Sequence, residues 1–508
     1  MRMGENGLSL RERIRMSVEN PNNISRTLPA FAALLALAAC STPASETAGW
    51  RTDGNGKYAA ATPPTEWSAT KNVVWSTPLP GHSNGSPALF GGMLYMTADP
   101  ETLLCVDASS GKILWQKTNT LEDAATPEEV AKYEAAKKDA DPLRKELQKL
   151  QADTRDARQQ SEKAPGDADL KKKLDDLKAK IGEVNTRLDG LNPILSAFDP
   201  ARTHKTNGYS SATPVTDGKN VYAVFGNGVA CCYDVKGERV WIRHIEPPSN
   251  QQGWGHSASP VLSGDKVFVH LTELRALNAA TGADAWTVKL QASWGTPAEV
   301  KIGDVPALLT PAGELVRISD GHVMARNLAR LEFASPIVSE GVAYFVEAGG
   351  KAIKLPEKAA DSVTPEVLWT AARGAKKAKE AAPANAAADP WTTPPLNERY
   401  YASAILHDGL LYDITRYGQY SVIDAKTGAI VFTKMLDHAG KAEFYPSVTF
   451  AGGHLYVSSD DGQTLVLEPG REYKEIAKNT LEDFRGSPVF DGKRVYIRGQ
   501  TKLYCIGE

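Results

Sequence analysis

The chain has 508 residues, of which 42% are hydrophobic and 23% charged, and its formal net charge at pH 7 is −3. This length is ample for a large hydrophobic core. The slight acidic excess argues against a nucleic-acid-binding protein, which would carry a basic surface. The five cysteines form no Cys-x-x-Cys-His haem motif and no Cys/His spacing suited to zinc, so no metal site is expected.

The N-terminus has the features of an export signal. Residues 28–39 form a short apolar segment after Arg26, too short to span a membrane comfortably, and this segment ends in small residues. We therefore predict that residues 1–39 are a cleaved signal peptide. Met16 is an alternative start, because residues 1–15 add an unusual charged extension.

A predicted lipid anchor follows this signal. Leu37-Ala38-Ala39-Cys40 resembles the bacterial lipobox, which implies that Cys40 is the lipidated first residue of the mature protein. By the same resemblance, Ser41 implies transfer to the outer membrane. A plain secretory signal with a coincidental cysteine is the alternative. Residues 40–71 are predicted to be a tether and an N-terminal segment.

One short pattern recurs eight times along the rest of the chain: a Ser or Thr, followed nine residues later by an aromatic or aliphatic residue. The pairs are Ser86/Tyr95, Thr213/Tyr222, Ser259/Phe268, Thr296/Val305, Ser335/Tyr344, Ser403/Tyr412, Ser447/Tyr456 and Ser487/Tyr496. Most successive Ser/Thr positions are about 40 residues apart, and the two longer gaps fit one repeat plus an insertion. A period near 40 made of short strands is typical of a β-propeller, in which each repeat is a four-stranded blade.

The closing half of the repeats has a spacing of its own. An Asp or Asn is followed after four residues by Gly and after four more by an aromatic residue, as in Asp107-Gly111-Trp115, Asn278-Gly282-Trp286 and Asp424-Gly428-Phe432. Glycine supplies a positive φ in a turn, and the aromatic ring presents a large apolar face to the neighbouring blade. We interpret these aromatic residues as packing between blades.

The two ends of the repeat region complement each other. The last repeat stops after its third strand, at residues 503–506, and a strand-like segment at residues 72–77 precedes the first repeat, with Trp75 in the closing aromatic position. We predict that this segment completes the last blade and leaves no sheet edge exposed. The fold class is thus all-β, an eight-bladed propeller over residues 72–508. The phrase at residues 106–115 resembles the repeat of quinoprotein (PQQ-like) propellers, a resemblance that covers about residues 50–508 apart from two insertions.

Two insertions interrupt the repeats, and both fall between the last strand of one blade and the first strand of the next. In residues 125–198, apolar residues at alternating steps of three and four predict an α-helical coiled-coil hairpin. Residues 374–398 are rich in Ala, Lys and Pro, which predicts a loosely ordered, low-complexity segment. Because both insertions enlarge the same face of a propeller, we interpret the hairpin as a partner-binding arm. A solvated decoration is the alternative.

The segments before each repeat converge on that face, around the mouth of the central channel. They carry aromatic, histidine and arginine side chains, a combination that concave ligand sites use. Packing at the top of the propeller is the alternative. No catalytic signature such as Gly-x-Ser-x-Gly or His-Glu-x-x-His is present, so no catalytic residue is assigned. We predict that a ligand or partner contacts His82, Trp254, His256, Trp294, Arg399 and Arg485.

Three cysteines, Cys105, Cys232 and Cys505, occupy the same place in their repeats, which predicts a shared role as small buried hydrophobic residues. The adjacent pair Cys231-Cys232 resembles the vicinal disulfide of some quinoprotein alcohol dehydrogenases. However, neighbouring side chains in a strand point to opposite faces, which favours free thiols here.

Two functions remain open. A lipobox followed by a compact propeller resembles the BamB-type barrel-assembly lipoproteins, which implies a non-enzymatic scaffold in the cell envelope, facing the periplasm, with protein partners and no cofactor. The helical hairpin departs from that family. The alternative is a quinoprotein dehydrogenase of alcohols or sugars, which needs PQQ with Ca²⁺ and for which no residues match the calcium ligands or the catalytic base. A glycan-binding or hydrolytic propeller is a further alternative.

Overall fold

The computed structural model describes residues 48–245, 253–347, 349–372, 399–437 and 442–508. The chain divides into Met1–Glu46 and Thr47–Glu508, and every described residue belongs to the second unit. The predicted signal peptide of residues 1–39, the lipidation site Cys40 and the insertion at residues 374–398 lie outside the described residues.

The described residues form eight sheets, seven of four strands and one of five, and the all-β prediction is confirmed for them apart from the helices given below. The first four sheets along the chain are β3 (Ala88–Phe90), β4 (Met93–Ala98), β5 (Thr102–Asp107) and β6 (Ile113–Thr118); β7 (Val215–Thr216), β8 (Asn220–Val224), β9 (Val229–Asp234) and β10 (Arg239–His244); β11 (Val261–Ser263), β12 (Lys266–His270), β13 (Leu274–Asn278) and β14 (Asp284–Val288); and β15 (Ala298–Ile302), β16 (Val305–Leu309), β17 (Leu315–Arg317) and β18 (Val323–Ala325).

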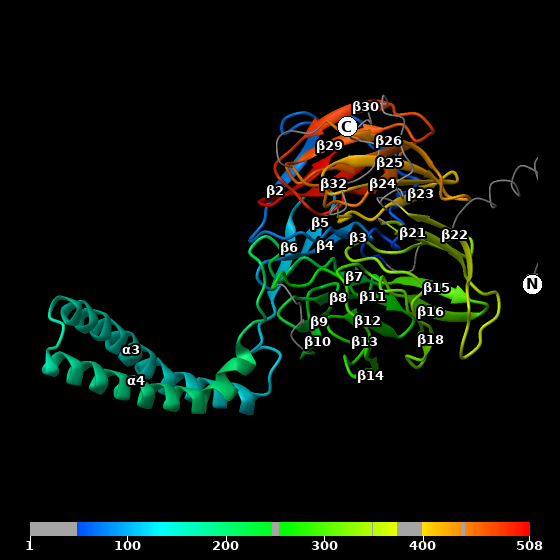
Figure 1. The fold of residues 1–508 in the computed structure, drawn as a ribbon. Helices are drawn as coiled ribbons and strands as arrows, with labels where there is room; N and C mark the ends of the chain where they lie inside the picture. Colours follow the sequence, from blue (N-terminus) through cyan, green and yellow to red (C-terminus); the bar gives the residue numbers. More distant parts are fainter. Residues whose placement is uncertain (1–47, 246–252, 348, 373–398, 438–441) are drawn as a thin grey trace, which may run out of the picture. The chain divides into compact units, whose positions relative to one another are not determined.

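The remaining sheets continue this order (Figure 1). They are β19 (Ile337–Ser339), β20 (Val342–Phe345), β21 (Gly349–Lys354) and β22 (Glu366–Ala372); β23 (Ile405–His407), β24 (Leu410–Ile414), β25 (Gln419–Asp424) and β26 (Ile430–Met435); β27 (Thr449–Ala451), β28 (His454–Ser458), β29 (Gln463–Leu467) and β30 (Glu475–Thr480), with β1 (Lys57–Tyr58) added beside β27; and β31 (Val489–Asp491), β32 (Arg494–Arg498) and β33 (Lys502–Ile506), with β2 (Val73–Pro78) added beside β33.

The last sheet joins the two ends of the chain. Strand β2 pairs antiparallel with β33, so that Trp75 lies opposite Cys505, as expected for the segment that precedes the first repeat. This pairing gives the last sheet the four strands that the other repeats build from consecutive sequence. The start and the end of the repeat region therefore lie in the same sheet.

Every sheet carries one β-bulge at the same place, between its third and fourth strands. The extra residue stands directly before the closing aromatic position: Val74, Leu114, Val240, Ala285, Met324, Leu368, Val431 and Ile476. A bulge disturbs the row of backbone groups that an edge strand offers, which discourages pairing with another chain. The regular bulge thus protects the outermost strands.

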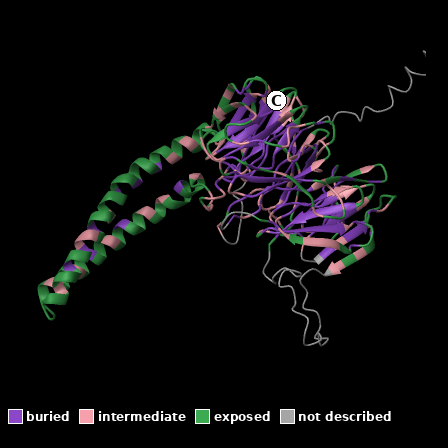
Figure 2. Ribbon diagram, turned by 90° about the horizontal axis from the view of Figure 1, so that it is seen from above, coloured by how far each residue is buried: buried purple, intermediate pink, exposed green. Residues whose placement is uncertain are grey.

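The sheets pack through the closing tryptophans. Trp241 of β10 lies on Gly282 in the turn of the next sheet, and its Nε1–H donates to Ala279 O at 2.8 Å. Trp75, Trp115, Trp286 and Trp369 contact the corresponding glycines of the following sheets. The predicted packing of these rings between neighbouring repeats is therefore present. Figure 2 shows the resulting buried strands.

Two helices lie side by side between β6 and β7 (Figure 1). Helix α3 (Pro127–Lys163) begins with a capping box in which Thr126 and Glu129 satisfy each other's backbone N–H groups. Helix α4 (Ala168–Leu195) begins at Asp167, whose carboxylate accepts from two N–H groups, and is followed by η1 (Ser196–Phe198). No helix in the described ranges is long and apolar enough to cross a membrane.

The helix pair has a hydrophobic core of its own. Leu143 and Leu150 of α3 are buried against Leu177 and Val184 of α4. The other faces of both helices are largely exposed, as Figure 2 shows. The pair therefore buries its apolar stripe internally and presents charged side chains outward.

The four described cysteines are buried free thiols, including the adjacent Cys231 and Cys232. Burial raises the pKa of the Cys505 thiol to about 11 and that of Cys105 to about 12. Since the thiolate is the reactive form, these groups are unreactive near neutral pH and serve as small hydrophobic residues.

Candidate functional site

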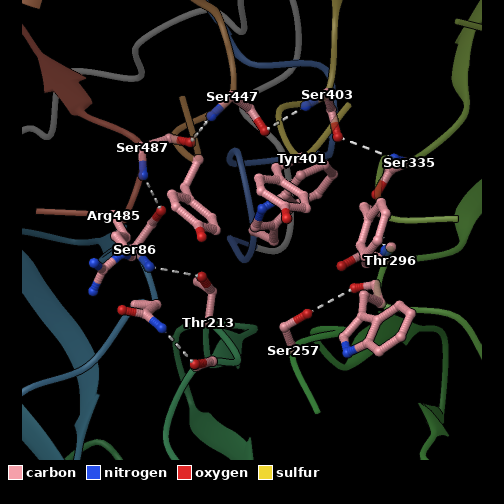
Figure 3. Close-up of a pocket in the computed structure, with 18 of the residues that line it drawn as sticks. Ser86, Thr213, Ser257, Thr296, Ser335, Tyr401, Ser403, Ser447, Arg485 and Ser487 are labelled. Carbon is pink, nitrogen blue, oxygen red and sulfur yellow. Dashed lines mark hydrogen bonds between the residues drawn. The ribbon is translucent and has the colours of Figure 1, made fainter. Parts of the chain in front are cut away.

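The eight repeated Ser/Thr residues form a closed ring of hydrogen bonds. Each stands two positions before a strand, and its backbone N–H donates to the side-chain oxygen of its counterpart in the next repeat, at 2.8–3.0 Å. The bond from Ser487 N to Ser86 Oγ completes the circuit (Figure 3). We call these eight residues the hydroxyl ring. The requirement for a small side chain that accepts a hydrogen bond explains why Ser or Thr recurs at this position.

A cavity of about 190 Å³ lies over the hydroxyl ring. Seven of the eight ring residues line it, all except Ser259. Its walls also include the residue two positions before each ring member, without exception: Asn84, Ser211, Ser257, Trp294, Phe333, Tyr401, Tyr445 and Arg485. Residues two apart in an extended chain face the same side, so this spacing directs all eight side chains inward.

One half of the cavity wall is aromatic. The ring centroids of Trp294 and Phe333 lie 5.0 Å apart, those of Phe333 and Tyr401 4.9 Å, and those of Tyr401 and Tyr445 4.7 Å. These offset and edge-on contacts are favourable arrangements for aromatic rings. We call these four residues the aromatic wall. The opposite half carries amide and hydroxyl groups, including Asn84 and Asn207.

Charged side chains at the edge of the aromatic wall are paired with one another. Arg485 donates to the Asp460 carboxylate at 3.0 Å and lies over the Tyr445 ring. Arg416 pairs with Glu443, and the Tyr445 hydroxyl donates to the same carboxylate at 2.6 Å. The network fixes the positions of Arg485 and Tyr445 relative to the cavity.

Arg399 is different. Its guanidinium lies over the Phe333 ring, 5.6 Å from the centroid, and it lines the cavity. Among the described residues, no carboxylate forms an ion pair with it. Arg399 is therefore the charged group of the lining that is most readily available to an external anion.

The N-terminal segment connects two opposite sides of the hydroxyl ring. Ala48 pairs with Thr216, at the end of β7. On the opposite side of the ring, the Arg51 guanidinium donates to Ala404 O at 3.1 Å and to Val448 O at 2.7 Å. Of this segment, Trp50 contributes to the cavity lining.

Four of the six predicted site residues line this cavity: Trp254, Trp294, Arg399 and Arg485. His256 does not. It is 5% exposed, and its Nε2 lies 2.8 Å from Ala258 O. His256 stands three positions before its ring residue, so the alternation that directs Ser257 inward turns the histidine away.

His82 also lies outside the cavity lining, with its Nε2 3.6 Å from Asp99 Oδ2. The lining residues not predicted as site residues include Trp50, Asn84, Phe333, Tyr401 and Tyr445. Four of them stand two positions before a repeated Ser/Thr, and this spacing could have identified them in the sequence. Trp50 lies outside the repeats and carries no such signal.

The two buried histidines predict a dependence of stability on pH. Burial lowers the pKa of His270 to about 4, as it does for His256. An unfolded histidine takes up a proton near pH 6.5, whereas the folded chain does so only near pH 4, so stability falls as the pH drops through this interval. Between pH 7 and pH 5, the wild type should lose about 2 kcal/mol more than His270→Gln.

Urea unfolding of both proteins at the two pH values measures this difference. Burial raises the pKa of Glu347 to about 7, which adds an opposite slope over the same range. Because Glu347 is common to both proteins, its contribution cancels in the comparison. Identical pH profiles for wild type and variant would show that His270 is accessible to protons in the folded state.

Comparisons with known proteins agree with this fold. Residues 50–140, 271–393 and 388–472, together more than half of the chain, match the family described as outer membrane protein assembly factor BamB. No curated protein matches the sequence. The crystal structure of BamB from Moraxella catarrhalis is similar with a TM-score of 0.51 at 10% identity, over 86% of this chain and 99% of that chain. A europium-containing methanol dehydrogenase is similar with a TM-score of 0.53 at 11% identity, over 91% and 98%.

At such low identity, the likeness to these two structures shows the fold alone. The match to the family model covers more than half of the chain and therefore shows which family the chain belongs to. The predicted resemblance to PQQ-like propellers is confirmed, and the chain belongs to the family of outer membrane protein assembly factor BamB.

Proposed function

We propose that this chain is a non-enzymatic protein-interaction scaffold of the bacterial cell envelope that acts in outer-membrane protein assembly. The match to the assembly-factor family over more than half of the chain carries this proposal. In it, the eight sheets are the blades of one propeller, closed by β2, and α3 and α4 form a coiled-coil hairpin. Cys40, in its lipobox-like context, anchors the protein to the outer membrane, facing the periplasm.

The helix pair is the proposed partner-binding arm. It interrupts the connection between β6 and β7, and its internal core satisfies its own apolar residues. Its exposed faces therefore pack against no other part of the described residues. Helices of 37 and 28 residues would offer a surface about 40–55 Å long.

Site-specific cross-linking in cells tests this arm. A photoreactive amino acid at Lys149 of α3 or at Lys180 of α4, both exposed, should cross-link to a discrete envelope protein. Lys493, exposed in the turn between β31 and β32, is the matched control and should give no such product. Products at Lys493 but not at the helices would contradict the arm. A variant that lacks residues 125–198 but retains every partner would do so as well.

The alternative is a PQQ-dependent dehydrogenase of alcohols or sugars. The aromatic wall with Arg399 and Arg485 suits a planar anionic cofactor. The calcium site does not fit: the described lining contains no carboxylate, and no group of three or more His, Cys, Asp and Glu residues in the described ranges could hold a metal. Saturable binding of PQQ that depends on Ca²⁺, followed by tryptophan fluorescence, would favour this alternative over the scaffold.

A further inference from the structure

The hydroxyl ring leaves its own protons unused. Each of its eight oxygens accepts one backbone N–H, and none of the eight hydroxyls donates to a protein acceptor within the described part of the chain. The eight residues are only 1–7% exposed. A buried donor without an acceptor costs about 1–3 kcal/mol. The hydroxyl ring therefore offers a circle of hydrogen-bond donors that have no acceptor among the described residues.

A buried positive charge lies next to two members of this ring. Arg51 is 2% exposed, and its guanidinium donates to the carbonyls of Ala404 and Val448, the residues that follow Ser403 and Ser447 in the ring. Burial lowers its pKa to about 10, so it remains charged at neutral pH. It forms no ion pair with any described residue. Asp53 is the carboxylate that favours its charged form, and a further negative charge in the cavity would stabilise the guanidinium as well.

The cavity lining also carries positive charge. Arg399 and Arg485 are the charged side chains of the lining, and only Arg485 has a carboxylate partner among the described residues. The described lining thus carries positive charge and no carboxylate, although it also holds one unpartnered acceptor, Asn84 Oδ1. Oxygen atoms of an anion are the partners that such a site selects, because hydrogen bonds between charged groups are stronger than neutral ones.

We propose that the axial cavity binds an oxyanion: the carboxylate or phosphate group of a small ligand whose apolar part contacts the aromatic wall. The oxyanion lies over the hydroxyl ring, where several O–H groups donate to it, and Arg399 approaches it from the mouth. Trp50 and the backbone around it close the other end, which keeps water away from these contacts. This site is separate from the proposed arm, and the two are tested independently.

Isothermal titration calorimetry with the purified protein tests the site. The probes are sodium benzoate, sodium phosphate and phenyl phosphate, each compared with sodium chloride at equal ionic strength. Saturable heat is expected for at least one oxyanion and not for chloride. Preference for benzoate indicates a carboxylate ligand, whereas preference for phenyl phosphate indicates a phosphate ester, and either result supports the proposal.

Two pairs of variants link the binding to the cavity. Arg399→Gln should weaken it about tenfold through loss of a charged hydrogen bond, whereas Arg317→Gln, which removes a surface partner of Asp320 and Asp361, should leave it unchanged. Ser447→Ala should also weaken binding, and Ser447→Thr, which keeps the hydroxyl, should restore it. Absence of saturable heat with every probe, or equal affinity in all four variants, would overturn the proposal and leave a cavity filled with water.

Discussion

Alanine at Gly282 should destabilise the fold by about 2–5 kcal/mol, from two separate costs. Gly282 has φ of +71°, a conformation that costs an L-residue about 1–2 kcal/mol. An added Cβ would also lie 2.7 Å from Trp241 Cδ2, and displacing a packed ring costs about 1–3 kcal/mol more. Equilibrium unfolding in urea, with circular dichroism as the signal, measures the total loss.

Gly264 is the matched control for this experiment. It lies in the same sheet, in the turn between β11 and β12, and has φ of +58°. A Cβ there would meet nothing within 4 Å. Gly264→Ala should therefore show only the backbone cost of about 1–2 kcal/mol. Equal losses at the two positions would mean that the contact between Trp241 and Gly282 does not hold neighbouring sheets together.

The same contact explains a spacing that is visible in the sequence. The Asp-Gly-Trp pattern places a glycine in one turn and a tryptophan in the following strand, and each ring packs on the glycine of the next repeat. The repeats were predictable because most sheets pack against the next one through the same two residue types, an aromatic ring and a glycine. Even where the ring is absent, as at Ala325 and Ala477, the bulge before that position is kept.

The N-terminal crossing was not predictable in this way. Residues 48–58 contact Thr216, Ala404 and Val448, which are far away in the sequence, and no period or motif marks these pairings. Arg51 and Thr52 adopt positive φ values, which their residue types do not suggest. Such non-local contacts depend on the finished ring of sheets, so a pattern in the segment itself cannot reveal them.

The cavity lining was half predictable, for a geometric reason. Residue type alone pointed to His256 as well as to Trp294, and only the alternation along an extended strand separates them. Trp294 stands two positions before its ring residue and lines the cavity, whereas His256 stands three before and is buried behind it. A search for the inward-facing position in all eight repeats would have found Phe333, Tyr401 and Tyr445.

The pairing of β2 with β33 leads to the second prediction with a large effect on stability. Trp75→Ala should destabilise the protein by about 3 kcal/mol, because the indole packs on Gly111 of the first sheet and near Tyr496 of its own. Among the described strands, β2 pairs along its backbone with β33 alone, and more than 400 residues separate the two in the sequence. Its loss would expose β33 as an unprotected edge.

Trp241→Ala is the control that separates packing from closure. Trp241 makes the same contact with a glycine of the next sheet, but β10 follows β9 directly in the chain and remains attached. Both variants should lose comparable free energy in urea. Trp75→Ala should become sensitive to limited proteolysis between β2 and β3 at protease concentrations that leave Trp241→Ala intact. The reason is that the strand weakened by Trp75→Ala comes from the other end of the chain, whereas the strand weakened by Trp241→Ala does not. Equal proteolysis of the two variants would show that β2 is held in its sheet no more weakly than a strand such as β10, which follows its neighbour directly in the sequence.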